Sequence, residues 1–381
     1  MFLDQTIRRN PQLVETAFML HQEGKILPDS YLVDVDVFLE NARRLLQKAG
    51  QNHIRLYFML KQIGRNPYLA KALVEMGYSG AVVVDFREAL VMMKNRIPIG
   101  NVGHLVQAPG ALIKELVAYK PEVMTIYSRE KAREIEAAAA GLGCRQAVML
   151  RVYGDFDMIY SGQTAGFHLD ELKETAIWMK TECPHLEIKG VTSFPCYLYD
   201  GEARDVLPTK NLETVKCAVE ILKTCGIDIA LINTPSATCC RTIDRMAEFG
   251  GNCSGTTPMH AVYELEERPA VVYVSEISHN FMGNAYCFGG GHYRRSHVKK
   301  VRVGTSLGHS RELTVIPPTD ESIDYHFGIS EECAVGDTAV MAFRFQIFVT
   351  RSDVVLVKGI QEGCPGIVGI YDSQGRKKEG F

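Results

Sequence analysis

The sequence predicts an α/β protein in which a (β/α)8 barrel is followed by a C-terminal β domain. Short apolar runs alternate with amphipathic helical stretches from residue 31 to about residue 233. After about residue 262, strand-like segments separated by Gly, Pro and Asp turns replace this pattern. A length of 381 residues also favours two domains over one. We expect an N-terminal helix and strand over residues 1–36 that join the β domain, the barrel over 37–262 and the β domain over 263–381.

The barrel is predicted from apolar strands that are each followed by a helix. Runs of Val, Ile and Leu are typical of strands buried on both faces, and intervening helices indicate parallel crossovers. Eight such units in roughly 200 residues fit a TIM barrel better than an open doubly wound sheet. The alternating segment 31–38 predicts a strand, and 38–50 a helix that Gly50 ends. The expected barrel strands are 54–61, 80–85, 97–107, 122–128, 146–153, 186–194 and 227–233, with a weak eighth near 251–254.

Composition excludes several classes of partner. The net charge of -3 and a pI near 6.4 give no basic footprint for nucleic acid. No run approaches the roughly 18 apolar residues that span a bilayer. The N-terminus is predicted to form an amphipathic helix without the apolar centre of a signal peptide, so we expect a cytoplasmic protein without a membrane partner.

Cysteines and histidines do not form a metal site in this sequence. The eleven cysteines are scattered singly except for Cys239-Cys240, and no Cys-x-x-Cys pair occurs. The eleven histidines show no His-Glu-x-x-His spacing. We therefore expect free thiols that pack as small apolar groups, and no bound metal.

Lys61 is the most informative single residue. It ends the apolar strand LYFML, so it is expected at the mouth of the barrel where TIM-barrel sites gather. A desolvated lysine at that position can form a Schiff base with an aldehyde cofactor. From position alone, a surface lysine at a strand end is the competing interpretation.

Two turns after the last strands have the composition of a phosphate site. In NTPSATCC (233–240), backbone N–H groups and the hydroxyls of Ser236 and Thr238 can donate to a phosphate; an ordinary helix N-cap is the alternative. GTTP (255–258) is a second turn of this kind. Such turns match the phosphate site that often follows strands seven and eight of these barrels.

The segment FGGGHYRR (288–295) is a third candidate. Its glycines allow unusual backbone angles, and Tyr293 is followed by two arginines. A Gly-rich bulge or hairpin is the structural alternative. A tyrosine held against cationic groups can instead act as an acid or base.

Together these residues resemble the fold-type III enzymes that use pyridoxal 5'-phosphate (PLP), which include alanine racemase and the basic amino-acid decarboxylases. The resemblance extends over nearly the whole chain. It is closer still to the YhfX-type PLP-dependent proteins in LKQIGRNP, GHLVQ, TPSATCC, GTTP, SEISHN, GGGHYRR and FQIFVTRSDVVLV. It implies an alanine-racemase-like barrel and β domain, an amino acid as substrate and a head-to-tail homodimer with shared active sites.

The resemblance also implies roles for individual residues. Lys61 would hold PLP covalently, and a tyrosine from the partner subunit, which corresponds to Tyr293, would be the second base. The implied cofactor-binding residues are Lys61, Arg65, Asn233, Ser236, Ala237, Thr238, Gly255 and Thr256. The implied substrate-binding residues are His104, Arg151, Gln163, Arg351 and Asp353, although His104 alone also suits a strand-end histidine. PLP withdraws electrons from the α-carbon of an amino acid, so a base on each face permits racemisation or epimerisation.

Two departures from the family pattern stand out. Thr192-Ser193-Phe194-Pro195 carries a serine where related proteins place a histidine. The stretch AEFGGNCSGTTP is shorter than the usual eighth strand and lacks a clear acidic partner for the pyridine nitrogen, since Glu248 is expected in the preceding helix.

Three other functions compete with racemisation. The same scaffold also supports amino-acid decarboxylation. A non-catalytic PLP-binding protein is a further alternative, although about 120 residues follow the barrel and proteins of that kind usually lack the β domain. A metal-dependent D-threonine aldolase is disfavoured because the C-terminal sequence offers no His/Asp metal cluster.

Overall fold

The computed structural model describes residues 2–246, 258–293, 295–319 and 321–379. It divides into two compact units. The first, which we call the β unit, comprises Met1–Arg43, Lys61–Leu69 and His260–Phe381. The second, the α/β unit, comprises Arg44–Leu60 and Ala70–Met259. The chain therefore passes between the units four times: within α3 (Val35–Gln51), after Leu60, within α4 (Pro67–Met76) and after Met259.

The α/β unit contains a parallel sheet whose strands neighbour one another in sequence order. The order is β2-β3-β4-β5-β7-β10, and β6 pairs with β5. Upstream of β2, the segment 54–60 continues the sheet, because Phe58 N–H donates to Gly80 O at 3.1 Å and Phe58 O accepts from Val82 N–H at 2.8 Å. The strand bounds are β2 (Ala81–Val82), β3 (Ile99–Val102), β4 (Val123–Ile126), β5 (Gln146–Tyr153), β6 (Phe167–His168), β7 (Leu186–Thr192) and β10 (Leu231–Asn233). The expected eighth strand near 251–254 lies outside the described residues.

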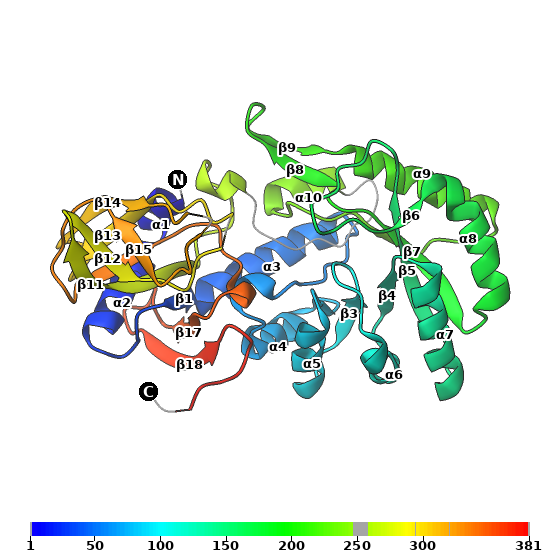
Figure 1. The fold of residues 1–381 in the computed structure, drawn as a ribbon, viewed down its shortest axis with the longest axis horizontal. Coiled ribbons are helices and arrows are strands. Elements are labelled where there is room, and N and C mark those ends of the chain that lie inside the picture. The colour runs from blue at the N-terminus through cyan, green and yellow to red at the C-terminus, as the bar shows by residue number, and fades with distance from the viewer. Residues whose placement is uncertain (1, 247–257, 294, 320, 380–381) are drawn as a thin grey trace. The chain divides into compact units, whose positions relative to one another are not determined.

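Helices connect successive strands of this sheet, as Figure 1 shows. Polar residues fix where several of them begin: Asp85 Oδ1 accepts from Glu88 N–H at 2.9 Å and Ser128 Oγ from Lys131 N–H at 3.3 Å, which is N-capping. The strand-helix alternation and its parallel pairing confirm the predicted parallel α/β class for this part, and the described strands form an open path from the segment 54–60 to β10. The helices are α5 (Phe86–Lys94), α6 (Gly110–Tyr119), α7 (Arg129–Leu142), α8 (Leu169–Glu182), α9 (Lys210–Thr224) and α10 (Cys240–Met246).

The β unit is built on a nine-stranded sheet in the order β12-β15-β14-β13-β16-β11-β1-β17-β18. A further pairing of β11 with β12 joins both ends of the run from β12 to β11, so these six strands form a closed path. The bounds are β1 (Ser30–Asp34), β11 (Val271–Phe281), β12 (Asn284–Phe288), β13 (Lys300–Gly304), β14 (Ser310–Ile316), β15 (His326–Ile329), β16 (Thr338–Met341), β17 (Asp353–Lys358) and β18 (Gly366–Asp372). The predicted C-terminal β domain is thus present, and β1 from the N-terminus lies in the same sheet.

The N-terminal segment differs from the single helix that its pattern predicts. It forms α1 (Phe2–Arg9) and α2 (Pro11–Gln22), because Asn10 Oδ1 accepts from Leu13 N–H at 3.2 Å and Pro11 starts a new helix. Apolar residues of α2 pack in one core with strands of the β unit. The next strand is also shorter than predicted: Asp34 Oδ1 accepts from Val37 N–H at 3.1 Å, so α3 begins at Val35.

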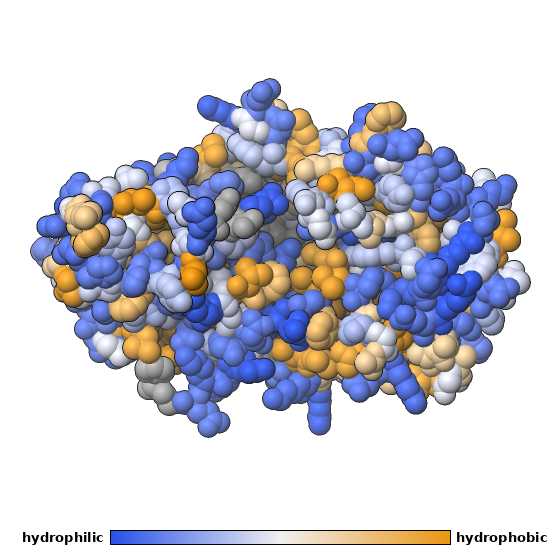
Figure 2. All heavy atoms as spheres, in the orientation of Figure 1, coloured by the Kyte–Doolittle hydropathy of each residue, from blue (hydrophilic) through white to orange (hydrophobic). Residues whose placement is uncertain are grey.

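The surface drawn in Figure 2 is largely hydrophilic, with apolar residues in small groups. Within the described residues, no helix has both the length and the apolar character to cross a membrane. The described cysteines are in the thiol form.

Candidate functional site

One face of the parallel sheet changes from apolar to polar toward the carboxyl ends of its strands. Val123, Met149 and Leu231 form a buried apolar cluster. Two residues further along each strand, where side chains return to the same face, the residues are polar: Thr125, Arg151 and Asn233. All three are at most 3% exposed. This polar layer is the floor of a candidate site within the α/β unit.

Hydrogen bonds between neighbouring strands order the polar layer. Thr125 Oγ1 donates to Asn101 Oδ1 at 2.8 Å, and Asn233 Nδ2 donates to Thr192 Oγ1 at 3.1 Å. Asn233 was predicted as a cofactor-binding residue; the other three were not. Alternation of apolar and polar residues at strand ends could have indicated Thr125 and Thr192.

Arg151 is held by Tyr127 and by the loop that follows β5. Its guanidinium lies 5.0 Å from the centre of the Tyr127 ring, donates to Tyr127 Oη at 3.2 Å and donates to Gln163 O at 2.8 Å. The Tyr127 hydroxyl in turn donates to His104 O. Burial raises the pKa of Tyr127, and the Arg151 charge opposes that rise, so the phenol is protonated at neutral pH. The structure therefore brings together three predicted substrate residues, His104, Arg151 and Gln163, around a tyrosine that the sequence analysis missed.

Phe194 occupies the centre of an aromatic cluster after β7. Its ring lies 5.9 Å from the His104 ring, edge-on, and 5.7 Å from the Tyr160 ring. The preceding Ser193 is 2% exposed, and its Oγ accepts from Asn211 Nδ2 at 3.0 Å. The serine that replaces the family histidine is therefore tied to α9.

The predicted phosphate turn after β10 contains buried hydroxyls. Ser236 Oγ donates to Tyr197 O at 2.8 Å, and Ala237 has a left-handed φ of 61°. The Oγ1 atoms of Thr234 and Thr238 are buried and have no hydrogen-bond partner among the described residues. Buried polar groups are normally satisfied, so these two hydroxyls suit a bound anion. The second predicted turn, with Gly255 and Thr256, lies outside the described residues, as does Glu248.

Lys61 begins a short 3-10 turn, η1 (Lys61–Ile63), directly after the segment 54–60. Chain continuity thus puts it at the carboxyl end of the first extended segment of the parallel sheet, and it is half-buried. Arg65 belongs to the packing of the β unit: it is 2% exposed, its guanidinium lies 5.2 Å from the centre of the Phe348 ring, and it donates to Gln374.

Tyr293 lies in the β unit with its hydroxyl buried, and that hydroxyl has no hydrogen-bond partner among the described residues. Its main chain is bound on both sides by Ser296, whose Oγ accepts from Tyr293 N–H at 3.0 Å and donates to Tyr293 O at 2.7 Å. Burial raises the pKa of Tyr293, while the charges of Arg344 and Arg295 lower it.

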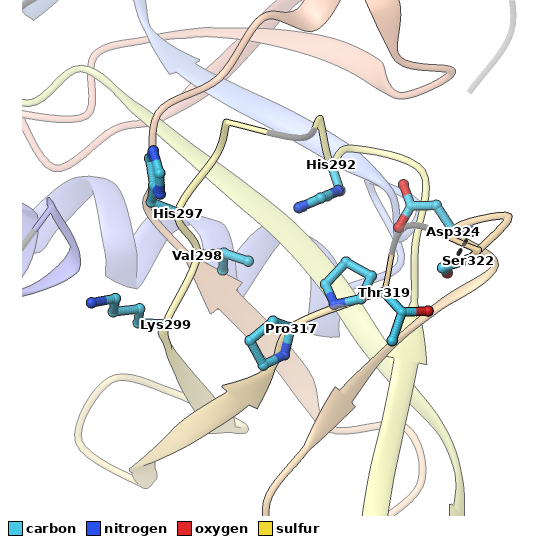
Figure 3. Close-up of a pocket in the computed structure, with 9 residues that line it drawn as sticks. His292, His297, Val298, Lys299, Pro317, Thr319, Ser322 and Asp324 are labelled. Carbon is cyan, nitrogen blue, oxygen red and sulfur yellow. Dashed lines mark hydrogen bonds between the residues drawn. The ribbon is translucent and has the colours of Figure 1, made fainter.

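The β unit contains a cavity of about 390 Å³. His292, the residue before Tyr293, forms part of its wall. Figure 3 shows the His292 ring pointing into this cavity, with Asp324 at one side. Burial lowers the pKa of His292, and the nearby Asp324 opposes this. The cavity is lined by His292, His297, Val298, Lys299, Pro317, Pro318, Thr319, Ser322 and Asp324.

The two remaining predicted substrate residues lie in the β unit and have protein partners. Arg351 Nη2 donates to Asp324 O at 2.6 Å, and its guanidinium lies 5.8 Å from the centre of the Tyr325 ring. Asp353 forms an ion pair with Lys378 at 2.7 Å. Among the residues that the structure describes, no group of His, Cys, Asp and Glu is arranged to hold a metal ion.

Comparison with known proteins shows the family. A family model for the N-terminal domain of alanine racemase matches residues 33–254, so the chain belongs to the alanine racemase N-terminal domain family. A second model, for the C-terminal domain of YhfX-like proteins, matches residues 272–367. The chain is 44% identical over 383 residues to the uncharacterized protein YhfX of Escherichia coli K12, and the match covers 98% of this chain and 99% of that protein.

Solved structures share the fold at low sequence identity. Alanine racemase from Bacillus anthracis with bound L-Ala-P aligns with a TM-score of 0.65 and 16% identity, covering 91% of this chain and 98% of that one. D-threo-3-hydroxyaspartate dehydratase from Delftia sp. HT23 aligns with a TM-score of 0.65 and 14% identity, covering 90% and 97%. A racemase and a dehydratase thus have the same architecture, which leaves the reaction to be argued from residues.

Proposed function

We propose that the protein is a PLP-dependent amino-acid racemase or epimerase. Membership of the alanine racemase family supports this proposal. The observation that carries the reaction type is the buried hydroxyl of Tyr293, which has no hydrogen-bond partner among the described residues. A phenol without a partner in the described chain is available to give or take a proton. In this proposal Lys61 and Tyr293 are the catalytic bases.

The residues that follow β10 fit the phosphate of the cofactor. The hydroxyls of Thr234 and Thr238, which have no partner among the described residues, would donate to the phosphate. The backbone N–H groups of Ser236 and Ala237 would do the same, since the Ser236 hydroxyl itself donates to Tyr197 O. Asn233 would act from the strand end, and Lys61 would hold the aldehyde carbon covalently. When bound, PLP supplies an electron sink that acidifies the α-carbon of an amino acid.

The protein's own groups would then move the proton. Lys61 would be freed as a neutral amine when the substrate amine takes its place on the cofactor. It would then accept the proton from one face of the α-carbon, and the Tyr293 phenol would donate a proton to the opposite face. Lys61 would be left as an ammonium and Tyr293 as a phenolate. Turnover of the opposite enantiomer, or proton exchange of both groups with water, would restore them. Arg151, fixed by Tyr127 and by Gln163 O, would bind the substrate carboxylate or the ring oxygen.

We further propose a head-to-tail homodimer in the cytoplasm, in which the partner subunit's Tyr293 serves each site. His104, Gln163, Arg351 and Asp353 remain proposed substrate-binding residues. Arg65 remains a proposed cofactor residue, although its contacts with Phe348 and Gln374 occupy much of its guanidinium.

The cofactor is tested by absorbance. Purified protein titrated with PLP is expected to gain a band near ~420 nm, which is typical of PLP joined to a lysine. Lys61→Ala is expected to lose this band, whereas Lys71→Ala, at an exposed lysine of α4, should retain it. A band that persists in Lys61→Ala would refute covalent attachment at this residue.

A further inference from the structure

The carboxylate of Asp29 lies under the Gly-rich segment that leads to Tyr293. Asp29 precedes β1, has a left-handed φ of 62°, and accepts Asp353 N–H on its main-chain oxygen at 3.0 Å. A positive φ is uncommon for a residue other than glycine, although Asp and Asn tolerate it best. The backbone therefore holds this side chain in a defined direction.

Two buried hydroxyls orient the carboxylate. Asp29 Oδ1 accepts from Tyr273 Oη at 2.9 Å and from Ser352 Oγ. Tyr273 is 1% exposed and Ser352 is fully buried. Burial raises the pKa of Asp29 to about 6, and the bonds from Ser352 and Tyr273 oppose the rise. At neutral pH the carboxylate is thus largely ionised, and the hydroxyls of Tyr273 and Ser352 hold it in place.

The other side of this group contacts the glycines. A Cβ on Gly290 would lie 2.1 Å from Asp29 Oδ2, and one on Gly291 would lie 2.2 Å from Cε2 of Tyr273. Gly290 also has a φ of 123°, which glycine adopts readily. The main chain of 290–291 therefore rests directly on Asp29 and Tyr273, at a distance that only glycine permits.

Further bonds fix the same stretch of main chain. Ser275 Oγ donates to Phe288 O at 2.7 Å, and Tyr31 Oη donates to Gly291 O. Tyr293 follows two residues later, and its hydroxyl has no hydrogen-bond partner among the described residues. These bonds therefore fix the main chain up to two residues before Tyr293.

We propose that Asp29 is a positioning residue for Tyr293, acting through the backbone of 290–291. The inference rests on the proposed role of Tyr293 as a catalytic base. Asp29 orients Tyr273 and contacts the main chain of the glycines. The conformation of these glycines then determines where the Tyr293 phenol lies. Displacing a catalytic group by about 1 Å can cost roughly 10²-fold in rate.

The first test is independent of activity. Hydrogen-deuterium exchange of the 288–293 amides is compared in the full-length wild type, Asp29→Ala and Asp36→Ala. Asp36 is an exposed aspartate of the β unit whose Oδ2 accepts Gly359 N–H at 2.8 Å, so it is a matched control. Asp29→Ala is expected to speed exchange there about tenfold while β17 keeps its protection. Unchanged exchange of these amides would overturn the proposal, whatever the protein catalyses.

The second test separates positioning from general destabilisation. The α-proton exchange of the amino acid that the wild type processes fastest is measured in deuterated water, for each single variant and for Asp29→Ala with Tyr293→Phe. Asp29→Ala is expected to lower kcat about 10- to 100-fold with KM changed less than about threefold. In the Tyr293→Phe background it should cause less than about a twofold further loss, because both changes act on one group. Equal losses in both backgrounds would overturn the proposal.

Asp29→Asn is the conservative variant. Its Oδ1 can still accept from Tyr273 and Ser352, so we expect activity within about threefold of the wild type. Wild-type activity in Tyr293→Phe would refute the role of Tyr293 as a base. It would not refute the contact between Asp29 and the main chain of 290–291, which the amide exchange tests separately. The two failures are thereby distinguishable.

Discussion

Two threonine hydroxyls beside β10, those of Thr234 and Thr238, are buried without a hydrogen-bond partner in the described part of the chain. A buried hydroxyl without a partner costs about 1–3 kcal/mol. Neighbouring Thr242 is different, because its Oγ1 donates to Ala237 O at 3.0 Å and accepts from Cys239 N–H at 2.9 Å. We therefore expect the Thr238 hydroxyl to bind a ligand and the Thr242 hydroxyl to stabilise the turn.

Thr238→Val is therefore expected to separate binding from stability. Without ligand, the free energy of unfolding should be unchanged or about 1 kcal/mol higher, while the affinity for PLP falls about tenfold, the effect of one lost hydrogen bond to a charged group. Thr242→Val should lower the free energy of unfolding by about 1–3 kcal/mol. Denaturant unfolding and absorbance titration measure both quantities. Equal destabilisation by the two variants would contradict a ligand role for Thr238.

At the scale of single residues, sequence reasoning found groups at strand ends better than groups that depend on packing. Asn233 ends one predicted strand and Arg151 lies two residues before the end of another, and the structure buries both in the polar layer. Tyr127 was missed because its importance comes from the stacking of Arg151 on its ring, which no local pattern reveals. Ser193 was identified as a departure, but its bond to Asn211 of α9 required the fold.

Among the elements, the segment 288–293 combines left-handed backbone with close contact. Gly290 has φ of 123° and faces Asp29, whereas Gly336 has φ of 90° and nothing within 4 Å of its added Cβ. A side chain added at either glycine would strain the backbone, but only one added at Gly290 would also collide with a buried carboxylate.

Gly290→Ala is expected to lower the free energy of unfolding by about 1–3 kcal/mol more than Gly336→Ala does. Both variants introduce backbone strain, so the difference between their free energies of unfolding measures the collision of the added Cβ with Asp29. Denaturant unfolding of both variants checks it. Equal effects would mean that the segment 288–293 can shift to accommodate the added methyl group and is not in close contact with Asp29.

Element types were largely predicted, but their ends were set by contacts that the apolar pattern does not contain. The alternation through residue 38 predicted a longer strand, yet the side chain of Asp34 caps a helix at Val35. The hairpin of β8 (Tyr197–Asp200) and β9 (Asp205–Pro208) was missed because it interrupts a strand-helix connection. The closed path of six strands depends on the long-range pairing of β11 with β12, and long-range pairing leaves little trace in local sequence.

For the whole molecule, the proposal makes each site depend on two subunits. Lys61→Ala and Tyr293→Phe should each be unable to racemise the substrate as homodimers. A heterodimer of the two would contain one site with both Lys61 and Tyr293 intact. Random exchange makes half of the dimers heterodimers, so the mixture should recover about a quarter of wild-type activity.

Refolding the two variants together and measuring racemisation of a single enantiomer tests this shared site. Each variant refolded alone is the control. If the mixture stays inactive while sedimentation shows mixed dimers, Tyr293 does not serve the partner subunit.

The most direct test of the central claim is chiral analysis of single-enantiomer amino acids incubated with the PLP-loaded protein in deuterated water. We predict that one of them loses optical purity, gains deuterium at the α-carbon and releases no carbon dioxide. Release of carbon dioxide and an amine would instead identify a decarboxylase, and retention of both chirality and the α-proton across all amino acids would contradict racemisation by this protein.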